Sequence, residues 1–443
     1  MNIKNLISKY ATSGPRYTSY PTALHFSPKT DKSKLTQLAI GDLPASLYIH
    51  IPFCKSLCWF CGCSSSVCSD LKKIDTYISL LERELELWRD FGMSKRPLRQ
   101  IHFGGGTPNL MTPEQILRVG QIIKKYFILT HDAEISCEFD PRTLTEQKAD
   151  AFIAIGLNRV SMGIQDTNID VQKAINRLQP QELNKRFIDY FRSCGIASIN
   201  TDIIYGLPLQ TTHSFSQTLN DLMQLNPDRI ALFGYAHVPW VKPSQKILEQ
   251  HKIPSSDNKV ELFITAMNFF KNAGYEYIGL DHFAKPNDTL ITARKNGTLH
   301  RNFQGYSTLA GLDTFAIGLT SISETKISYR QNHKDMNAYI DTLNKGILPI
   351  ERGIILNADD IVRRAIIMDI MCSLKVVYKN YGVDFKVLFA DALSNLKQFQ
   401  QDNLVEIYDD YFEVTQLGRI FLRNIAMLFD NRLSTSQQYS KTV

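Results

Sequence analysis

The chain has 443 residues, of which 44% are hydrophobic and 21% charged, as is typical of a soluble globular protein with one large or several smaller domains. The net charge of +6 is mild and the Lys and Arg residues are scattered, so composition does not indicate a nucleic-acid partner. No run approaches the ~18 apolar residues of a membrane helix, and the first residues do not resemble a secretory signal. We therefore expect a cytoplasmic protein without a membrane partner.

Strands and helices are expected to alternate after a polar N-terminal arm, residues 1–40. The expected strands are 46–51, 99–103, 134–139, 159–164, 199–204, 229–235 and 275–280. A helical apolar stripe joins Ile74, Tyr77, Ile78, Leu81, Leu85 and Trp88. Thr112 and Gln115 predict a capping box at the start of another helix. Repeated strand–helix units across residues 41–345 predict an α/β fold with a parallel sheet, a partial or full TIM-like βα barrel.

The last part of the chain, residues 346–443, is expected to form a separate, mainly helical domain. Two short β-rich runs meet there around Asp409 and Asp410, so the segment resembles a winged-helix module. Such modules often bind DNA, but the expected hairpin tip is acidic and no basic stripe accompanies the helices. We favour a structural cap on the barrel over a DNA-binding domain.

Four cysteines, Cys54, Cys58, Cys61 and Cys63, follow the first expected strand within one loop. These four cysteines could form disulfides, bind zinc, hold an iron–sulfur cluster or have no shared role. Cytoplasmic thiols stay reduced, and structural zinc normally requires two ligand pairs separated by a dozen or more residues. The C-x3-C-x2-C spacing on one loop instead suits a [4Fe–4S] cluster, with each thiolate on a different iron.

Three cysteine ligands would leave one iron of such a cluster able to bind the amino and carboxylate groups of S-adenosylmethionine. Phe60 has the aromatic place before the third cysteine, so the stretch carries the radical S-adenosylmethionine signature. The C-x-C spacing of Cys61 and Cys63 disfavours Cys63 as a fourth ligand. The other cysteines, Cys68, Cys137, Cys194 and Cys372, are expected to be small buried side chains.

Polar or glycine-rich stretches end several of the expected strands. They are GGGTP at 104–108, Glu138 and Asp140, Gln165 and Asp166, Asp202, and the run from Tyr235 to His237. Because the carboxyl ends of parallel strands lie on one face of a barrel, these groups predict a lined cavity next to the cysteine loop.

With these motifs in hand, the sequence resembles the oxygen-independent coproporphyrinogen III oxidase family of haem biosynthesis. The resemblance extends through nearly the whole chain, including SGPRYTSYPTALHF, YIHIPFCKSLCWFCGC, HFGGGTPNLM, EFDPR, NRVSMGIQD, TDIIYGLP, NPDRIALFGYAH, LHRNFQGY and GRIFLRNIAM. It implies oxidative decarboxylation of two propionates of coproporphyrinogen III to vinyl groups, with an external electron donor and an external electron acceptor.

The resemblance also implies roles for individual residues. Cys54, Cys58 and Cys61 would hold the [4Fe–4S] cluster, and Cys63 would be required without being a ligand. Two S-adenosylmethionine molecules are implied. The cluster-bound one would contact Tyr48, Gly105, Glu138 and Ile322. The second would contact Phe60, Gly106, Thr107, Gln165, Arg177, Asp202 and Ala236.

A substrate with four propionates requires cations, and Arg can grip a carboxylate with two parallel hydrogen bonds. Arg16 and Arg301 are the candidates, against the alternative of salt bridges that hold the arm in place. A haem chaperone or a haem-degrading relative of the same superfamily is the rival function. The arm and Cys63 favour the oxidase. A monomer is expected.

Overall fold

The computed structural model describes residues 3–433, 439 and 442. The chain forms two compact units, each built from separated segments. The large unit comprises residues 26–266 and 312–355, and the small unit comprises residues 1–25, 267–311 and 356–443. The sequence predicts domain boundaries at residues 40 and 345, each domain being one continuous stretch of chain. These boundaries stay a prediction. No helix in the described residues is both long and apolar enough to cross a membrane.

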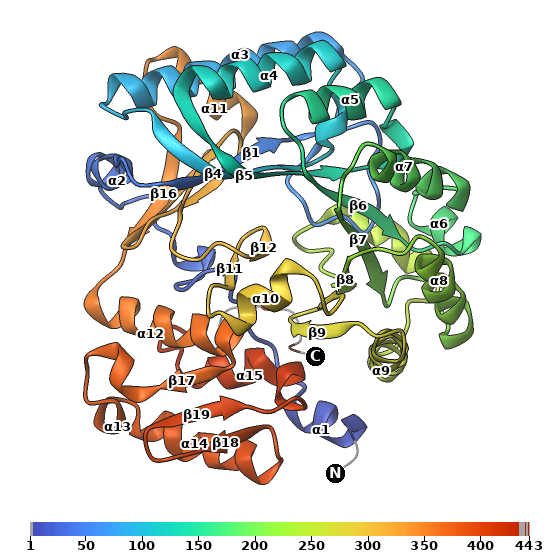
Figure 1. Cartoon of the computed structure of the whole chain (residues 1–443), viewed down its shortest axis with the longest axis vertical. Coiled ribbons are helices and arrows are strands. Elements are labelled where there is room, and N and C mark those ends of the chain that lie inside the picture. The colour runs from blue at the N-terminus through green and yellow to red at the C-terminus, as the bar shows by residue number, and fades with distance from the viewer. Residues whose placement is uncertain (1–2, 434–438, 440–441, 443) are drawn as a thin grey trace. The chain divides into compact units, whose positions relative to one another are not determined.

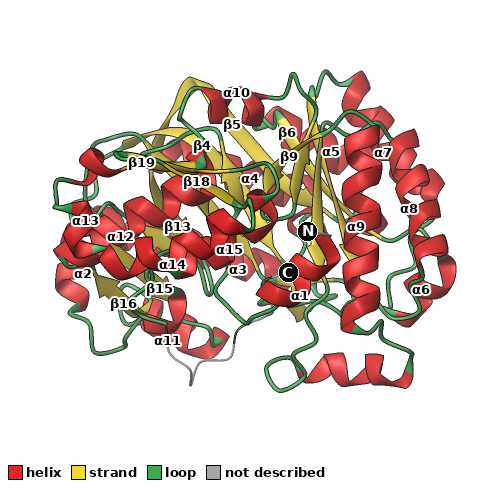
Figure 2. Ribbon diagram, turned by 90° about the horizontal axis from the view of Figure 1, so that it is seen from below, coloured by secondary structure: helices red, strands yellow, loops and turns green. Residues whose placement is uncertain are grey.

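A parallel sheet is the centre of the large unit (Figures 1 and 2). Its neighbouring parallel strands are, in order, β1 (Ala45–Ile51), β4 (Arg96–Gly105), β5 (Phe127–Phe139), β6 (Arg159–Gln165), β7 (Ser198–Tyr205) and β8 (Arg229–Gly234). The other side of β1 continues through β13 (Asp313–Ile317), β14 (Ile322–Glu324), β15 (Ser328–Asn332) and β16 (Ile350–Ile355). Of these four only β13 is parallel to its inner neighbour, β1. The α/β fold class with a partial barrel is confirmed.

Helices cover the sheet of the large unit, and the predicted apolar stripe is the buried face of α3 (Leu71–Asp90). The helices are α2 (Lys32–Ala39), α3, α4 (Pro113–Tyr126), α5 (Glu146–Ala154), α6 (Ile169–Ala174), α7 (Gln181–Ser193), α8 (Thr212–Gln224) and α11 (Met336–Asn344). Figure 1 shows α3 and α4 side by side over β1, β4 and β5. The predicted capping box is present, because the Thr112 and Gln115 side chains each accept a hydrogen bond from the backbone N–H of the other.

The small unit contains helices and short antiparallel strands. Its strands are β9 (Glu276–Gly279), β10 (His282–Ala284), β11 (His300–Asn302), β12 (Gly305–Ser307), β17 (Lys375–Val377), β18 (Val405–Ile407) and β19 (Tyr411–Val414). Its helices include α1 (Ile3–Tyr10), α10 (Thr289–Lys295), α12 (Ala358–Met368), α13 (Phe385–Leu388), α14 (Ala390–Gln401) and α15 (Leu422–Met427), while α9 (Ser256–Asn272) begins in the large unit. The expected hairpin around Asp409 and Asp410 is formed by β18 and β19.

Two sequence expectations are wrong. The run 275–280 does not add a parallel barrel strand, because β9 pairs antiparallel with β10 inside the small unit. A short β-rich run is compatible with either arrangement, so the sequence pattern could not distinguish them. Cys194 is exposed, because it follows α7 as the C-cap residue, whereas Cys68, Cys137 and Cys372 are buried as expected.

The first part of the arm, up to residue 25, folds as part of the small unit, whereas residues 26–40 belong to the large unit. The Arg423 guanidinium donates to the Pro15 carbonyl oxygen at 2.9 Å, and the Tyr17 hydroxyl donates to the Asp430 carboxylate at 2.9 Å. The Tyr20 hydroxyl adds a bond to the Asn431 side chain at 2.7 Å. The GPRYTSYP segment is therefore held by polar contacts with the last helix and the residues after it.

A buried carboxylate on α3 organises the turn between β13 and β14. Glu84 is fully buried and accepts hydrogen bonds from the Tyr339 hydroxyl at 2.6 Å, the Asn332 amide at 2.8 Å and the Gly318 N–H at 3.0 Å. Burial raises the pKa of Glu84. Gly318 has a φ of +97°, and a side chain there would approach the Tyr77 hydroxyl to 2.5 Å. This network fixes the turn that precedes Ile322.

Replacing Glu84 with Ala should lower the free energy of unfolding of the large unit by about 1–3 kcal/mol for each buried donor left unsatisfied. Chemical denaturation measures this loss. Glu86→Ala, which removes a more exposed carboxylate from the same helix, is the matched control and should change stability by no more than about 0.5 kcal/mol. Equal effects of the two substitutions would contradict the organising role of Glu84.

Candidate active site at the carboxyl ends of the parallel strands

The cysteine loop begins directly after β1 and returns to it. β2 (Phe53–Cys54) and β3 (Ser66–Val67) pair in parallel, and the Cys68 N–H donates to the Cys54 carbonyl at 2.9 Å. Cys58 is buried, Cys54 and Cys61 are partly buried, and Cys63 is exposed; none forms a disulfide. The loop therefore keeps all its thiols available at the carboxyl edge of the sheet.

A hydrogen-bond chain connects this loop to β1. The His50 ring approaches the Ser64 carbonyl oxygen at 3.0 Å through Nε2 and the Tyr48 hydroxyl at 3.0 Å through Nδ1. A carbonyl oxygen only accepts, so Nε2 carries the proton and the Tyr48 hydroxyl donates to Nδ1. Burial lowers the pKa of His50 and so favours the neutral ring.

Cys54 and Cys61 each accept one hydrogen bond at sulfur from the surrounding loops. The Thr107 hydroxyl donates to Cys54 Sγ and the Cys63 N–H donates to Cys61 Sγ, each at 3.4 Å. Hydrogen bonding from Cys63 is the main cause of a lowered pKa at Cys61. Lys242, which also donates to the Cys63 carbonyl at 2.8 Å, lowers it further. The thiolate, which is the form that binds metals, is thereby favoured.

The first group of predicted cofactor residues lies together at the ends of β1, β4 and β5. Glu138, whose side chain is 43% exposed, accepts from the Gly105 N–H at 3.4 Å and from His102 Nε2 at 3.2 Å. The Tyr48 ring stacks on His102 with centroids 5.9 Å apart. Ile322, the remaining member of this group, is the first residue of β14 and is partly buried.

The glycines at the end of β4 and just after it leave no room for a side chain. A Cβ on Gly105, which has a φ of +111°, would lie 2.7 Å from the His50 ring. A Cβ on Gly106 would lie 2.7 Å from the Phe53 carbonyl oxygen. Close packing of backbone against backbone at a strand end is the geometry in which peptide groups, rather than side chains, face a ligand.

The second group of predicted residues extends along β6 and β7. Arg177 donates to the Gly163 carbonyl at 2.6 Å, is 6% exposed, and has a buried Nε for which residues 3–433, 439 and 442 provide no hydrogen-bond partner. A Cβ on Gly163 would lie 2.7 Å from the Gln165 amide nitrogen. Asp202 accepts from Ser161 at 3.2 Å and from Asn200 at 2.8 Å.

Phe60 and Ala236, the remaining predicted cofactor residues, lie next to an apolar part of the large unit. Phe60 and Trp59 pack against a buried cluster made by Val171, Ile175, Ile204, Leu207, Tyr235 and Leu248. The Phe60 carbonyl accepts from Gln245 at 3.1 Å. Ala236 follows Tyr235 just past β8 and is partly buried. Phe60, the aromatic residue of the cysteine motif, is therefore hydrogen-bonded to the segment that follows β8.

Sequence reasoning missed Arg142, His50 and His102. All three stand in quoted motifs, but their roles depend on which side chains approach them in space. Arg142 donates to Cys58 Sγ at 3.3 Å. The predicted Arg16 and Arg301 belong to the small unit.

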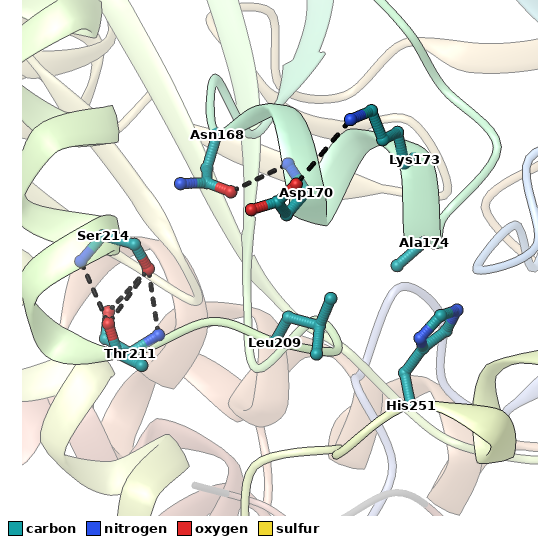
Figure 3. Close-up of a pocket in the computed structure, with 8 residues that line it drawn as sticks. All are labelled: Asn168, Asp170, Lys173, Ala174, Leu209, Thr211, Ser214 and His251. Carbon is teal, nitrogen blue, oxygen red and sulfur yellow. Dashed lines mark hydrogen bonds and ion pairs between the residues drawn. The ribbon is translucent and has the colours of Figure 1, made fainter.

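A separate pocket of about 490 Å³ lies beside α6 and α8 (Figure 3). Its walls are Asn168, Asp170, Lys173, Ala174, Leu209, Thr211, Ser214 and His251. The dashed lines of Figure 3 mark the Asp170–Lys173 ion pair at 3.8 Å and the cap of α8 by Thr211 and Ser214. None of the predicted site residues lines this pocket.

The raised pKa of Asp202 predicts that the stability of the protein depends on pH. Removal from bulk water and the nearby Glu138 carboxylate raise its pKa to about 7, although Asn200, Ser161 and Arg177 lower it. Because the pKa in the fold exceeds the unfolded value, Asp202 should cost stability progressively as pH rises from about 4 to about 7.

Thermal unfolding of Asp202→Asn beside the wild type, without added ligands, should show a stability advantage of the variant that grows over this pH range and then levels off. Asp189→Asn, a change at an exposed carboxylate of α7, is the control for altered surface charge. A difference between variant and wild type that does not vary with pH would contradict the raised pKa.

The chain is similar to known proteins over nearly its full length. Residues 48–222 match the Radical SAM superfamily and residues 356–421 match the HemN C-terminal domain. The oxygen-independent coproporphyrinogen III oxidase of Helicobacter pylori is 41% identical and that of Escherichia coli 39% identical, with 98–99% of this chain and 98% of each relative aligned. The structure of Escherichia coli coproporphyrinogen III oxidase, described as a radical SAM enzyme, superposes with a TM-score of 0.91 over 94% of this chain and 98% of that one, at 39% identity. The chain belongs to the family of oxygen-independent coproporphyrinogen III oxidases.

Proposed function

We propose that this chain converts two propionate side chains of coproporphyrinogen III to vinyl groups by oxidative decarboxylation, giving protoporphyrinogen IX. The observation that carries the proposal is the collection of Cys54, Cys58 and Cys61 at the carboxyl end of β1, next to the glycine turn after β4. The similarity to the oxidases over nearly the full length supports the choice of substrate.

Cys54, Cys58 and Cys61 are the proposed ligands of a [4Fe–4S] cluster. The donor set fits, because the thiols are free, come from one loop and accept hydrogen bonds of the kind that support iron–sulfur ligands. Cys63 is exposed, and its backbone supports Cys61, which suits a required residue that is not a ligand. The cluster together with S-adenosylmethionine supplies the one-electron chemistry, and the protein supplies binding, orientation and exclusion of water.

One S-adenosylmethionine is proposed to contact Tyr48, Gly105, Glu138 and Ile322. The half-exposed Glu138 carboxylate is an acceptor for an ammonium group, and the backbone at Gly105 can approach a ligand because it carries no side chain. The hydrogen bond from His102 orients Glu138, and the bond to His50 orients the Tyr48 hydroxyl. These contacts orient the groups proposed to bind the ligand.

The second S-adenosylmethionine is proposed to contact Phe60, Gly106, Thr107, Gln165, Arg177, Asp202 and Ala236. The unpartnered Nε of Arg177 is a donor for a carboxylate of such a ligand. Asp202, held by Ser161 and Asn200, would ionise beside a cationic ligand and attract it. The Phe60 side offers an apolar wall.

Arg301 is the stronger of the two propionate candidates. It is 4% exposed, its guanidinium lies over the Tyr306 ring at 4.9 Å, and its Nε and Nη1 have no hydrogen-bond partner in the part of the chain that the structure describes. A buried guanidinium with unmet donors is stabilised by a carboxylate that accepts two hydrogen bonds. Arg16 already pairs with Asp281 at 2.5 Å, so a propionate would have to compete with that carboxylate.

We further propose that the protein acts as a cytoplasmic monomer, with an external low-potential electron donor and an external electron acceptor, and without nucleic acid.

Anaerobic turnover tests the proposed function. Reconstituted wild-type protein with S-adenosylmethionine, a low-potential reductant, an electron acceptor and coproporphyrinogen III should yield protoporphyrin after oxidation, as resolved by chromatography. Cys58→Ala should lose both cluster and product, because it removes a ligand. Cys63→Ser should keep the cluster and lose product, and the exposed Cys194→Ser, the matched control, should keep both.

Protein that holds its cluster and cleaves S-adenosylmethionine but makes no protoporphyrin would refute decarboxylation. Haem binding or haem opening would then be the function to measure, by absorbance of the purified protein incubated with haem.

Arg301→Gln should raise the Michaelis constant for coproporphyrinogen III about 10- to 100-fold, the size expected for losing a charged hydrogen-bonded pair. Arg301→Lys should restore little of this, because an ammonium cannot replace the planar fork. Arg16→Gln is the comparison and should have the smaller effect, since Arg16 is paired with Asp281. An unchanged Michaelis constant in Arg301→Gln, with cluster content intact, would remove Arg301 from the substrate site.

A further inference from the structure

Cys58 differs from Cys54 and Cys61 in the charge of its hydrogen-bond donors. Its sulfur accepts from two guanidinium groups, Arg142 Nη2 at 3.3 Å and Arg177 Nη1 at 3.5 Å. Cys54 and Cys61 accept instead from a neutral hydroxyl and a neutral backbone N–H. Cys58 is also only 6% exposed, so this charge acts with little solvent screening.

Asp140 holds both guanidinium groups in place from behind. Arg142 donates to Asp140 through Nε at 3.0 Å and through Nη2 at 2.7 Å, and Arg177 donates to it through Nη1 at 3.1 Å. Asn109 in turn fixes the Asp140 backbone. The Asp140 N–H donates to Asn109 Oδ1, and Asn109 Nδ2 donates to the Asp140 carbonyl oxygen, each at 2.9 Å. The two arginines therefore point at Cys58 without depending on any ligand.

The charges around Cys58 do not cancel. Arg142 and Arg177 contribute two positive charges and Asp140 one negative charge, which leaves one positive charge beside the sulfur. Positive charge and N–H···S hydrogen bonds stabilise a cluster that has gained an electron and so raise its reduction potential. Without Arg142, the remaining Arg177–Asp140 pair would be neutral.

We propose that Arg142 raises the reduction potential of the cluster bound through Cys58, and thereby sets how readily an external donor can reduce it. The step concerned is the transfer of one electron from a low-potential reductant to the bound cluster, with no bond formed or broken. This inference rests on the proposed function, because it requires the cluster. It assigns Arg142 a role beyond holding the loop after β5.

The experiment is an anaerobic redox titration of reconstituted protein, with the reduced cluster followed by electron paramagnetic resonance. Arg142→Gln should lower the midpoint potential by an amount equal to at least a tenfold fall in the equilibrium constant for reduction, which is 59 mV for one electron. Arg142→Lys should restore part of the shift, because it keeps the charge without the fork to Asp140.

Asp140→Asn provides a test with the opposite sign. It removes the negative charge and should raise the midpoint potential, whereas a merely structural disturbance would shift both variants in the same direction. Arg186→Gln, which removes an exposed arginine of α7 that pairs with Glu146, is the control and should leave the potential unchanged.

An unchanged or raised potential in Arg142→Gln would overturn the inference while leaving the proposed function intact. If Arg142→Gln cannot hold a cluster, Asp140→Asn decides, and a potential that does not rise in that variant overturns the inference. A wild-type protein that binds no cluster would instead overturn the proposed function.

Discussion

The constraint on which the site depends is the parallel order of β1, β4, β5, β6 and β7, since it makes all their carboxyl ends open on one edge. Residues more than a hundred positions apart in the chain thereby meet, as Cys58 meets Arg177. An antiparallel arrangement would send alternate strand ends to opposite edges and scatter the same motifs. The motifs have a shared function only because the strands run the same way.

Hydrogen bonds from neighbouring side chains then fix each functional group. His50 connects the cysteine loop to Tyr48, His102 orients Glu138, and Asp140 holds the arginines that face Cys58. These supporting groups are themselves packed or hydrogen-bonded, so protein contacts orient the proposed ligand-binding groups. Preorganisation of this kind limits the conformational cost of ligand binding.

In the small unit, too, side-chain hydrogen bonds and ion pairs hold distant segments together. The arm is joined to the last helix and the residues after it by Arg423, Tyr17 and Tyr20, and Arg16 is paired with Asp281. Arg301 differs from Arg16 and Arg423, because its Nε and Nη1 are buried without a hydrogen-bond partner among the described residues. Arg16 and Arg423 therefore hold segments of the fold together, whereas Arg301 keeps two donors for a ligand.

The sequence by itself determined the α/β class, the first six parallel strands, the capped helix at Thr112 and the loop that carries the cysteines, because strand and helix periodicity and cysteine spacing are local properties of the chain. Only the tertiary structure decided that 276–279 forms a hairpin strand, that Arg16 pairs with Asp281, and that Arg142 faces Cys58. Each of these depends on contacts between distant segments. A local pattern shows which groups a chain can offer, but the contact partner of each group depends on the packing of the whole fold.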